Sequence, residues 1–417
     1  MLARCCLLIL LSGLALSDAF AQVAADRIYG TITTRDGGTF EGLIRWDNNE
    51  ASWVDVIDGN KMIMDRTARS GQRSVRVFGI EVTGVEDRDN VRSSAAGIRF
   101  GHLESLENIG SNRALFTLRS GQQVEFRGGT TDIGNGNRGI MVEDPNRGEV
   151  ELRWRDIERI DFAQAPDDAR SRYGERLYGR LVTQRGLAFT GYICWDMDEL
   201  LGDDVLDGED EDEYDRKIRF SDLLAIEHNS NSSARVELRN GETLVLRGSN
   251  DVNRSNSDIL VLDPLMGQVR VPWEAFERVD FMTPDEPTTY RSFPGADALR
   301  GTVFTREGAF TRDDDRFDGP VRWGDDKSHA WELLNGELGD LTFDIEMGLV
   351  AEIERLSSRS ALVMLRDGRT FELDGSHDVN KGNDGIFVLI SEDTDEYREL
   401  RIRIPWRDFD RIVFDKP

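Results

Sequence analysis

Three polar loops carry the residue types that can bind a metal ion. Each loop begins with an Asp, has an Asn five positions later and reaches an Ile eight positions after the Asp. The candidate ligands are Asp132, Asn137, Asp251, Asn253, Asn256, Asp378, Asn380 and Asn383. Their carboxylate and amide oxygens are the hard ligands that Ca²⁺ prefers. Asp and Asn also cap turns by accepting hydrogen bonds from backbone amides, so a purely structural role for these loops is the alternative.

A second set of acidic residues follows a tryptophan in each of three segments of equal length. These segments, each from a Trp to a Gly, are 46–59, 195–208 and 323–336. Their acids include Asp47, Asp55 and Asp58 in the first, and Asp196, Asp204 and Asp207 in the second. None of the three matches the calcium-loop pattern of alternating Asp or Asn followed by Gly and a distant Glu. The sequence therefore favours solvated acidic loops here over a site for a metal or a cationic partner.

No motif in the sequence points to catalysis. The four histidines show no metal-ligand spacing, and neither a nucleophile elbow nor a phosphate-binding loop nor a paired-cysteine motif occurs. The net charge of −27 repels a phosphate backbone, which argues against nucleic acid and anionic membranes as partners. We therefore expect a non-enzymatic protein, and an enzyme with a site between domains remains as an alternative.

The candidate loops are positioned by short β-hairpins. Apolar and polar residues alternate strictly on both sides of a Ser-Gly, Asn-Gly or Asp-Gly pair, a pattern that predicts two antiparallel strands joined by a tight turn. The hairpins span residues 114–128, 234–248 and 361–375. Each of them directly precedes one of the Asp/Asn loops. A further strand is predicted after each loop, around Ile140, Ile259 and Ile386.

A nine-residue phrase closes each third of the chain. It occurs as WRDIERIDF from Trp154, WEAFERVDF from Trp273 and WRDFDRIVF from Trp406, and fainter copies begin at Phe100, Phe220 and Met347. The apolar spacing changes from two to three and back, which predicts a strand, one 3₁₀ turn and a strand. Six tryptophans in phase with apolar strand residues are predicted to be core: Trp46, Trp154, Trp195, Trp273, Trp323 and Trp406. Trp53 and Trp331 lie off this phase and are predicted to be exposed.

These patterns predict an all-β protein of three tandem repeats, residues 22–163, 176–282 and 298–417. Each repeat divides into two units of five short strands, with a tight turn before the last strand. Such a unit resembles the small SH3-like and Sm-like β-barrels. The resemblance implies paired barrels at about 28–109 and 110–163, 176–229 and 230–282, and 298–356 and 357–417. Three larger two-sheet β domains are the alternative, and a resemblance at the level of fold implies no function.

The N-terminus has the features of a cleaved signal peptide over residues 1–21. Arg4 precedes an apolar run at 7–16, and Ala19 and Ala21 occupy the positions that a signal peptidase recognises. We therefore expect export to a periplasm or the extracellular space, and no membrane span in the mature chain. Cleavage leaves Cys194 as the remaining cysteine. A surface or half-buried thiol is favoured there, and a Cys194-linked dimer is the alternative.

The sequence as a whole predicts an exported, non-enzymatic β-repeat protein that acts as a binding module or an envelope scaffold. Its partner would be another protein or an envelope polymer. The alternative is a calcium-stabilised surface protein that uses the Asp/Asn loops.

Overall fold

The structure, a computed structural model, describes residues 24–65, 73–77, 80–84, 90–293, 295, 297–309, 315–324, 326–393 and 398–416. The predicted signal peptide, residues 1–21, lies outside these ranges. The described chain is built from strands, loops and three-residue 3₁₀ turns, which confirms the predicted all-β class. Within these ranges, no helix has the length and apolar character needed to span a bilayer.

The described residues of repeat one form twelve strands and two 3₁₀ turns. They are β1 (Tyr29–Thr34), β2 (Thr39–Trp46), β3 (Val56–Asp65), β4 (Arg73–Val77), β5 (Ile80–Gly84), β6 (Asn90–Arg99), η1 (Phe100–His102), β7 (Leu103–Gly110), β8 (Arg113–Leu118), β9 (Gln123–Arg127), β10 (Ile140–Asp144), β11 (Gly148–Leu152), η2 (Trp154–Asp156) and β12 (Ile157–Phe162). The β4–β5 hairpin is an insertion that the other two repeats lack.

In the part of the chain that the structure describes, repeats two and three have ten strands each. Repeat two holds β13 (Tyr178–Thr183), β14 (Ala188–Cys194), β15 (Val205–Glu209), β16 (Asp215–Arg219), η3 (Phe220–Asp222), β17 (Leu223–Ser230), β18 (Ser233–Leu238), β19 (Thr243–Arg247), η4 (Asn250–Val252), β20 (Ile259–Asp263), β21 (Gly267–Val271) and β22 (Phe276–Phe281). After η5 (Tyr290–Ser292) in the linker, repeat three holds β23 (Arg300–Thr305), β24 (Arg316–Trp323), β25 (Leu333–Leu338), β26 (Leu341–Glu346), η6 (Met347–Leu349), β27 (Val350–Arg355), β28 (Ala361–Leu365), β29 (Thr370–Leu373), η7 (His377–Val379), β30 (Ile386–Asp393), β31 (Arg398–Ile404) and β32 (Phe409–Phe414).

The predicted hairpins and tight turns form where the sequence places them. Gly121, Gly241 and Gly368 turn the β8–β9, β18–β19 and β28–β29 hairpins with φ of 83°, 90° and 91°, a conformation that favours glycine. A 3₁₀ turn precedes the last strand of the first closing phrase and of all three fainter copies. In the other two phrases, a hydrogen-bonded turn after Pro272 and Pro405 replaces it.

Each repeat contains two five-stranded units, and repeat two shows their order most clearly. The outer unit has the order β21-β20-β14-β13-β22 and uses the first two and last three strands of the repeat. The inner unit has the order β16-β15-β19-β18-β17 and uses the five strands between them. The antiparallel pair β17–β22 joins the two units. The same pairings recur in repeat one and, with an isolated bridge from Glu337 to Asp374 joining β25 to β29, in repeat three. None of the three sheets closes on itself.

The sequence predicted two units per repeat, each contiguous along the chain. In the structure, the two predicted units of each repeat instead exchange halves. Strand β2 pairs with β10 and β9 pairs with β3, so the pairing crosses the predicted boundary at residues 109/110. Equivalent pairings cross the boundaries at 229/230 and 356/357. A glycine makes the exchange possible sterically. A Cβ at Gly59, Gly208 or Gly336 would lie 2.9–3.0 Å from a side chain of the other predicted unit.

Two connections per repeat therefore pass between the outer and inner units. We call residues 47–55, 196–204 and 324–332 the crossover turns. We call residues 128–139, 248–258 and 374–385 the crossover loops. The crossover loops contain the Asp/Asn positions, and the crossover turns contain most of the second set of acidic residues.

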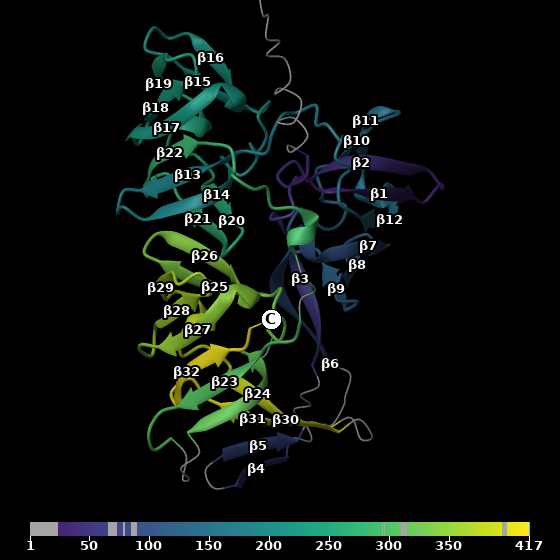
Figure 1. Ribbon diagram of the computed structural model, residues 1–417, viewed down its shortest axis with the longest axis vertical. Helices are drawn as coiled ribbons and strands as arrows, with labels where there is room; N and C mark the ends of the chain where they lie inside the picture. Colours follow the sequence, from purple (N-terminus) through teal and green to yellow (C-terminus); the bar gives the residue numbers. More distant parts are fainter. Residues whose placement is uncertain are drawn as a thin grey trace, which may run out of the picture.

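The repeats are also joined to one another by β-pairing. Strand β21 of repeat two pairs with β26 of repeat three, which makes a continuous 12-stranded sheet. Strand β5 of the repeat-one insertion pairs with β31 of repeat three. In Figure 1, repeats two and three form one column, repeat one lies beside it, and the β4–β5 hairpin covers the bottom of the column.

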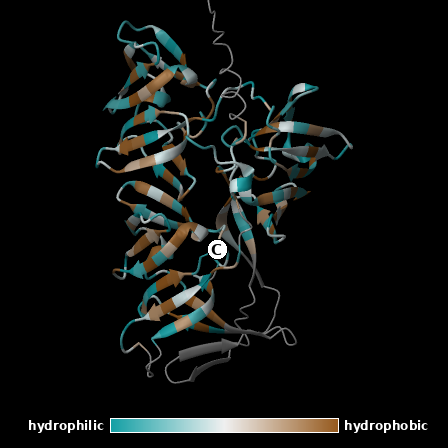
Figure 2. Cartoon of the chain, in the orientation of Figure 1, coloured by the Kyte–Doolittle hydropathy of each residue, from teal (hydrophilic) through white to brown (hydrophobic). Residues whose placement is uncertain are grey.

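The core follows the strands, where the hydrophobic residues gather in Figure 2. All six tryptophans predicted as core are buried. The prediction that Trp53 and Trp331 are exposed is wrong, since both are almost fully buried where repeats meet. Trp53 packs against Tyr290 of the second linker at 4.6 Å between ring centroids, and Trp331 donates a hydrogen bond to Gln122 of repeat one. Both tryptophans are buried by contacts between repeats, and such contacts follow no periodic pattern in the sequence.

Candidate functional site

The two crossovers of each repeat are fastened together by the same hydrogen bonds. The indole Nε1 of Trp46, Trp195 and Trp323 donates to the backbone carbonyl of Asp132, Asp251 and Asp378, at 3.0, 2.9 and 3.0 Å. The carboxylates of those aspartates accept from the backbone amides of Asp58, Asp207 and Asn335, at 2.6, 2.6 and 2.8 Å. All three aspartates are buried. Trp and Asp together thus hold the crossover loop to the strand that follows the crossover turn.

The asparagines of the loops serve local turns. The side-chain oxygens of Asn137, Asn256 and Asn383 accept from backbone amides two residues later, at 3.0, 3.1 and 2.8 Å. Asn253 and Asn380 make the same contact at 2.6 and 2.7 Å. These amide oxygens are therefore engaged in turn capping, which leaves the aspartates as the metal-ligand candidates of the three loops.

The crossover turn places one ionisable residue beside each of these aspartates. A β-bridge links Trp46 to Glu50, Trp195 to Glu199 and Trp323 to Lys327, so these three residues are structurally equivalent. The turn between them passes through the left-handed region, at Asp47 (φ 46°), Asp196 (φ 50°) and Gly324 (φ 61°). Sequence reasoning aligned the segments but missed Glu50, Glu199 and Lys327, because it considered aspartates alone.

In repeat three, the junction contains its own cation. Lys327 is 5% exposed, and its Nζ lies 2.9 Å from Oδ1 of Asp378 and 3.3 Å from Oδ2 of Asp326. Burial by itself would lower the pKa of Lys327, but the charges of Asp378 and Asp326 raise it above the ordinary value. The ammonium is therefore retained in a buried site.

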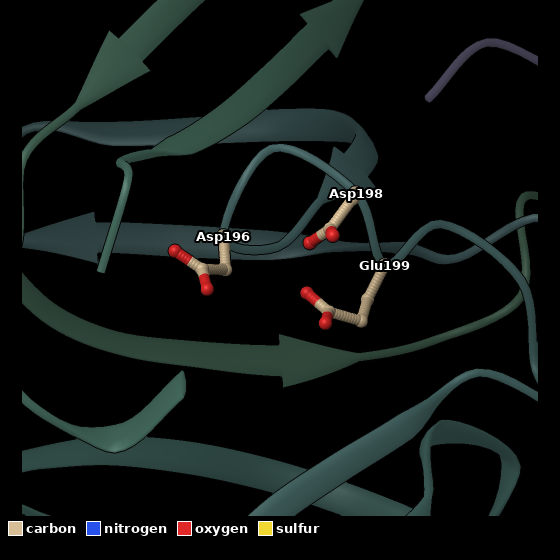
Figure 3. Close-up of side chains that lie close together, drawn as sticks. All are labelled: Asp196, Asp198 and Glu199. Carbon is tan, nitrogen blue, oxygen red and sulfur yellow. The ribbon is translucent and has the colours of Figure 1, made fainter. Parts of the chain in front are cut away.

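In repeat two, carboxylates converge at the same place. One carboxylate oxygen each from Asp196, Asp198 and Glu199 lies within 4.8 Å of the other two, and Figure 3 shows the Asp198 and Glu199 side chains directed into a shared space. Burial and the charge of Asp198 raise the pKa of Glu199 to about 10. Burial, with the charge of Asp196 adding to it, raises the pKa of Asp251 to about 6.

In repeat one, Glu50 stands opposite Asp132. The Arg138 guanidinium lies 3.3 Å from Asp47, so that carboxylate has a cationic partner. Glu50 is 5% exposed, and no described residue offers a hydrogen bond to its Oε2. Burial, and then the Asp132 charge, raise the pKa of Glu50 well above its ordinary range, and burial raises the pKa of Asp132 to about 7.

The last acidic residue of each crossover turn binds another repeat. Asp55, Asp204 and Glu332 each accept hydrogen bonds from two consecutive backbone amides of their own turn. Their cationic partners are Arg176 of repeat two, Arg45 of repeat one and Lys61 of repeat one. Asp55 and Glu332 are buried, whereas Asp204 is half-buried and Asp198 is exposed. The prediction of solvated acidic loops therefore fails for the buried acids, which bind backbone amides and cations of the protein.

Cys194 lies on β14 where repeats one and two meet. It is buried among Tyr192, Leu200 and other residues of the core that repeat one shares with repeat two. The prediction of a surface or half-buried thiol is therefore wrong. A Cys194-linked dimer would require this contact between repeats to open, because the thiol is enclosed.

Comparison with known proteins yields little. No family model matches the chain, and no curated protein matches it. Among solved structures, a match covers 83% of this chain and 99% of virginiamycin B lyase from Staphylococcus aureus, at 8% identity and a TM-score of 0.11. A score this low carries no argument about fold or function.

Proposed function

We propose that this chain is an exported, non-enzymatic scaffold that presents its surface loops to another protein or to an envelope polymer. The observation that carries the proposal is the way the repeats are joined. The 12-stranded sheet crosses from repeat two into repeat three, and the Arg176–Asp55 pair between repeats one and two is 2.9 Å long with side chains 0% and 2% exposed. A frame fixed in this way keeps distant loops at constant spacing, which is what a scaffold requires.

The proposed building block of this frame is the SH3-like or Sm-like barrel, in a version that exchanges halves within each repeat. Five short antiparallel strands per unit, with a tight turn before the last, are the features that support it. Surfaces of this kind commonly bind extended or proline-rich peptides, so a protein partner of that type fits the proposal.

A fractionation and cross-linking experiment in the protein's own cells tests this function. The expected result is a mature chain that begins at Gln22, recovered from the exported fraction and cross-linked reproducibly to one protein or polymer. Recovery of the uncleaved chain inside the cell would contradict export. A mature chain that yields no cross-link above that of an unrelated exported protein would contradict the binding role.

A second experiment tests the rigid frame. Isolated repeat two, residues 176–282, loses the β26 partner of β21 and the Asp55 partner of Arg176. We expect this fragment to fail to fold cooperatively, whereas the chain from residue 22 to 417 unfolds cooperatively. A fragment as stable as the full chain would show that the repeats are independent units.

A further inference from the structure

The three crossover junctions have the same backbone geometry but differ in charge. The bridge from Trp to the fourth residue beyond it, the indole bond to the loop carbonyl and the amide bond to the loop aspartate recur in all three. In repeat three, the fourth residue is Lys327, and its ammonium binds Asp378. In repeats one and two, the fourth residue is a glutamate, so two acids face each other at the place where repeat three has an ion pair.

Facing carboxylates inside a protein are unstable without compensation. Two like charges a few ångströms apart repel each other strongly at low effective dielectric, and each loses its hydration. In repeat one, Glu50 is more than nine-tenths buried and its Oε2 lacks a partner among the described residues. A buried acceptor without a protein partner is a position where a water molecule or an ion can bind.

Repeat two offers a fuller set of oxygen ligands. One carboxylate oxygen each from Asp196, Asp198 and Glu199 lies within 4.8 Å of the other two. Asp196 is buried, Glu199 is half-buried and Asp198 is exposed, and Oε2 of Glu199 is buried without a hydrogen-bond partner among the described residues. Asp251 faces them from the crossover loop, as Asp378 faces Lys327. In both glutamate-containing junctions, an acid therefore occupies the position of the Lys327 ammonium, while the Arg138 guanidinium of repeat one is paired with Asp47.

We propose that the crossover junctions of repeats one and two each bind a divalent metal cation, at the position that the Lys327 ammonium occupies in repeat three. In repeat one, Glu50 and Asp132 are the carboxylate ligands. In repeat two, the ligands are the three converging carboxylates of Asp196, Asp198 and Glu199, with Asp251 facing them from the crossover loop. The bound cation links the crossover turn to the crossover loop and so fixes the exchange between the outer and inner units. Repeat three performs the same task with a lysine and needs no metal.

The ligand chemistry indicates which cation to test. The groups are hard oxygen donors, without the thiolates or imidazoles that favour zinc or copper. Ca²⁺ accepts carboxylate and carbonyl oxygens in irregular geometry, whereas Mg²⁺ demands a near-octahedral site. We therefore expect Ca²⁺ to bind more tightly than Mg²⁺. Sites of this kind in exported proteins have dissociation constants on the order of 10⁻⁴ to 10⁻³ M.

Calorimetric titration of the EDTA-stripped chain, residues 22–417, with Ca²⁺ and separately with Mg²⁺ tests the inference. The expected stoichiometry is two Ca²⁺ per chain, with a melting temperature that rises as Ca²⁺ is added. Glu50→Lys and Glu199→Lys copy repeat three. Each is expected to remove one bound Ca²⁺ and to raise the melting temperature in EDTA. The double variant should bind no Ca²⁺. The experiment is carried out on purified protein, so its result does not depend on export or on a partner.

Glu242→Lys is the matched control, because it makes the same change of charge at an exposed hairpin position. It should leave the stoichiometry at two. If a lysine variant fails to fold, Glu50→Gln and Glu199→Gln provide the same stoichiometry test with a smaller change. The inference is overturned if stripped protein binds neither cation, or if Glu50→Lys and Glu199→Lys bind as much Ca²⁺ as Glu242→Lys. A melting temperature that responds to pH but not to either cation would show that a proton, rather than a metal, occupies the junctions.

Discussion

The junctions of repeats one and three solve the same structural problem with opposite charges. Both fasten a crossover turn to a crossover loop by a buried Trp, a loop aspartate and a backbone amide. Beside that aspartate, repeat three places the cation Lys327 and repeat one places the acid Glu50. The difference shows that backbone-directed hydrogen bonds determine the geometry of the junction, since the geometry persists when the neighbouring charge is reversed.

A second difference concerns what each junction needs from its surroundings. The Lys327–Asp378 pair is complete within repeat three. In the junction of repeat one, the two corresponding side chains, Glu50 and Asp132, are both acidic and both buried, so they do not form an ion pair with each other. Substitution, a change of pH and added metal should therefore change the stability of the protein in opposite directions at a buried ion pair and at a buried pair of like charges. Four predictions use this contrast.

The largest effect is expected when repeat three is given the charge pattern of repeat one. Lys327→Glu removes a buried cation and places a second acid beside Asp378. Breaking a buried ion pair typically costs about 3–5 kcal/mol, and we expect a loss of free energy of unfolding in that range in EDTA. Urea denaturation measures it. We expect Ca²⁺ to restore part of the loss. A variant as stable as the original chain in EDTA would show that Lys327 has no compensating role.

The same substitution in two repeats should have different effects. Asp378→Asn leaves Lys327 with the more distant Asp326, and we expect a loss of about 3 kcal/mol. Asp251→Asn removes one acid from a cluster of acids, while the remaining amide oxygen still accepts from Asp207. We expect a change below about 1 kcal/mol in EDTA. Urea denaturation of both variants makes the comparison. Equal losses would contradict the assignment of opposite charge patterns.

The ion pairs between repeats should differ according to their burial. Arg176→Met leaves the buried carboxylate of Asp55 without its cation, and a loss of about 3 kcal/mol is expected. Arg45→Met breaks the equivalent pair with Asp204, whose side chains are 17% and 16% exposed, and about 1 kcal/mol is expected. Thermal melts at low and high salt provide the measurement. The pair of Arg45 should weaken with salt more than that of Arg176. A larger loss for Arg45→Met, or a stronger salt dependence for the Arg176 pair, would indicate that burial does not determine the strength of these ion pairs.

The smallest effect is a pH dependence of the metal-free protein. The folded-state pKa of Asp132 is raised to about 7 and that of Asp251 to about 6, from 3.8. The folded state therefore holds protons that the unfolded state has released. The stability that these groups contribute is fully present below about pH 4 and is lost as the pH rises through about 6 to 7.

Melting curves in EDTA from pH 5 to 8 measure this slope. Glu50→Lys should flatten the contribution of Asp132, because an adjacent ammonium stabilises the ionised carboxylate. Saturating Ca²⁺ should flatten it in the original chain. A slope that is unchanged in the variant would place the titrating groups outside the junctions.

Much of the secondary structure could be predicted from the sequence because it depends on local patterns. Alternation around Asn240–Gly241 defines a hairpin wherever its strands pair, and the spacing after Trp154 defines a 3₁₀ turn. The candidate site was predicted in part. The aspartates of the crossover loops were identified, but their position beside Glu50, Glu199 and Lys327 was not, because these residues lie more than 50 positions away along the chain.

Burial of the off-phase residues could not be predicted in the same way. Trp53 and Trp331 follow no strand period, and each is buried by another part of the chain, Tyr290 in one case and Gln122 in the other. Sequence periodicity reports how a residue faces its own sheet. It does not predict which surfaces become buried when repeats pack together.

The sequence by itself determined the all-β class, the three repeats, the hairpins and the six core tryptophans. The tertiary structure decided which half of one unit pairs with which half of the next. A strand such as β2 has the same alternation and the same free edge whether it pairs within its own unit or with β10. The alternation of apolar and polar side chains along a strand is therefore the same with or without the exchange. The crossover junctions exist because of that exchange, which brings a turn and a loop from two units to one place.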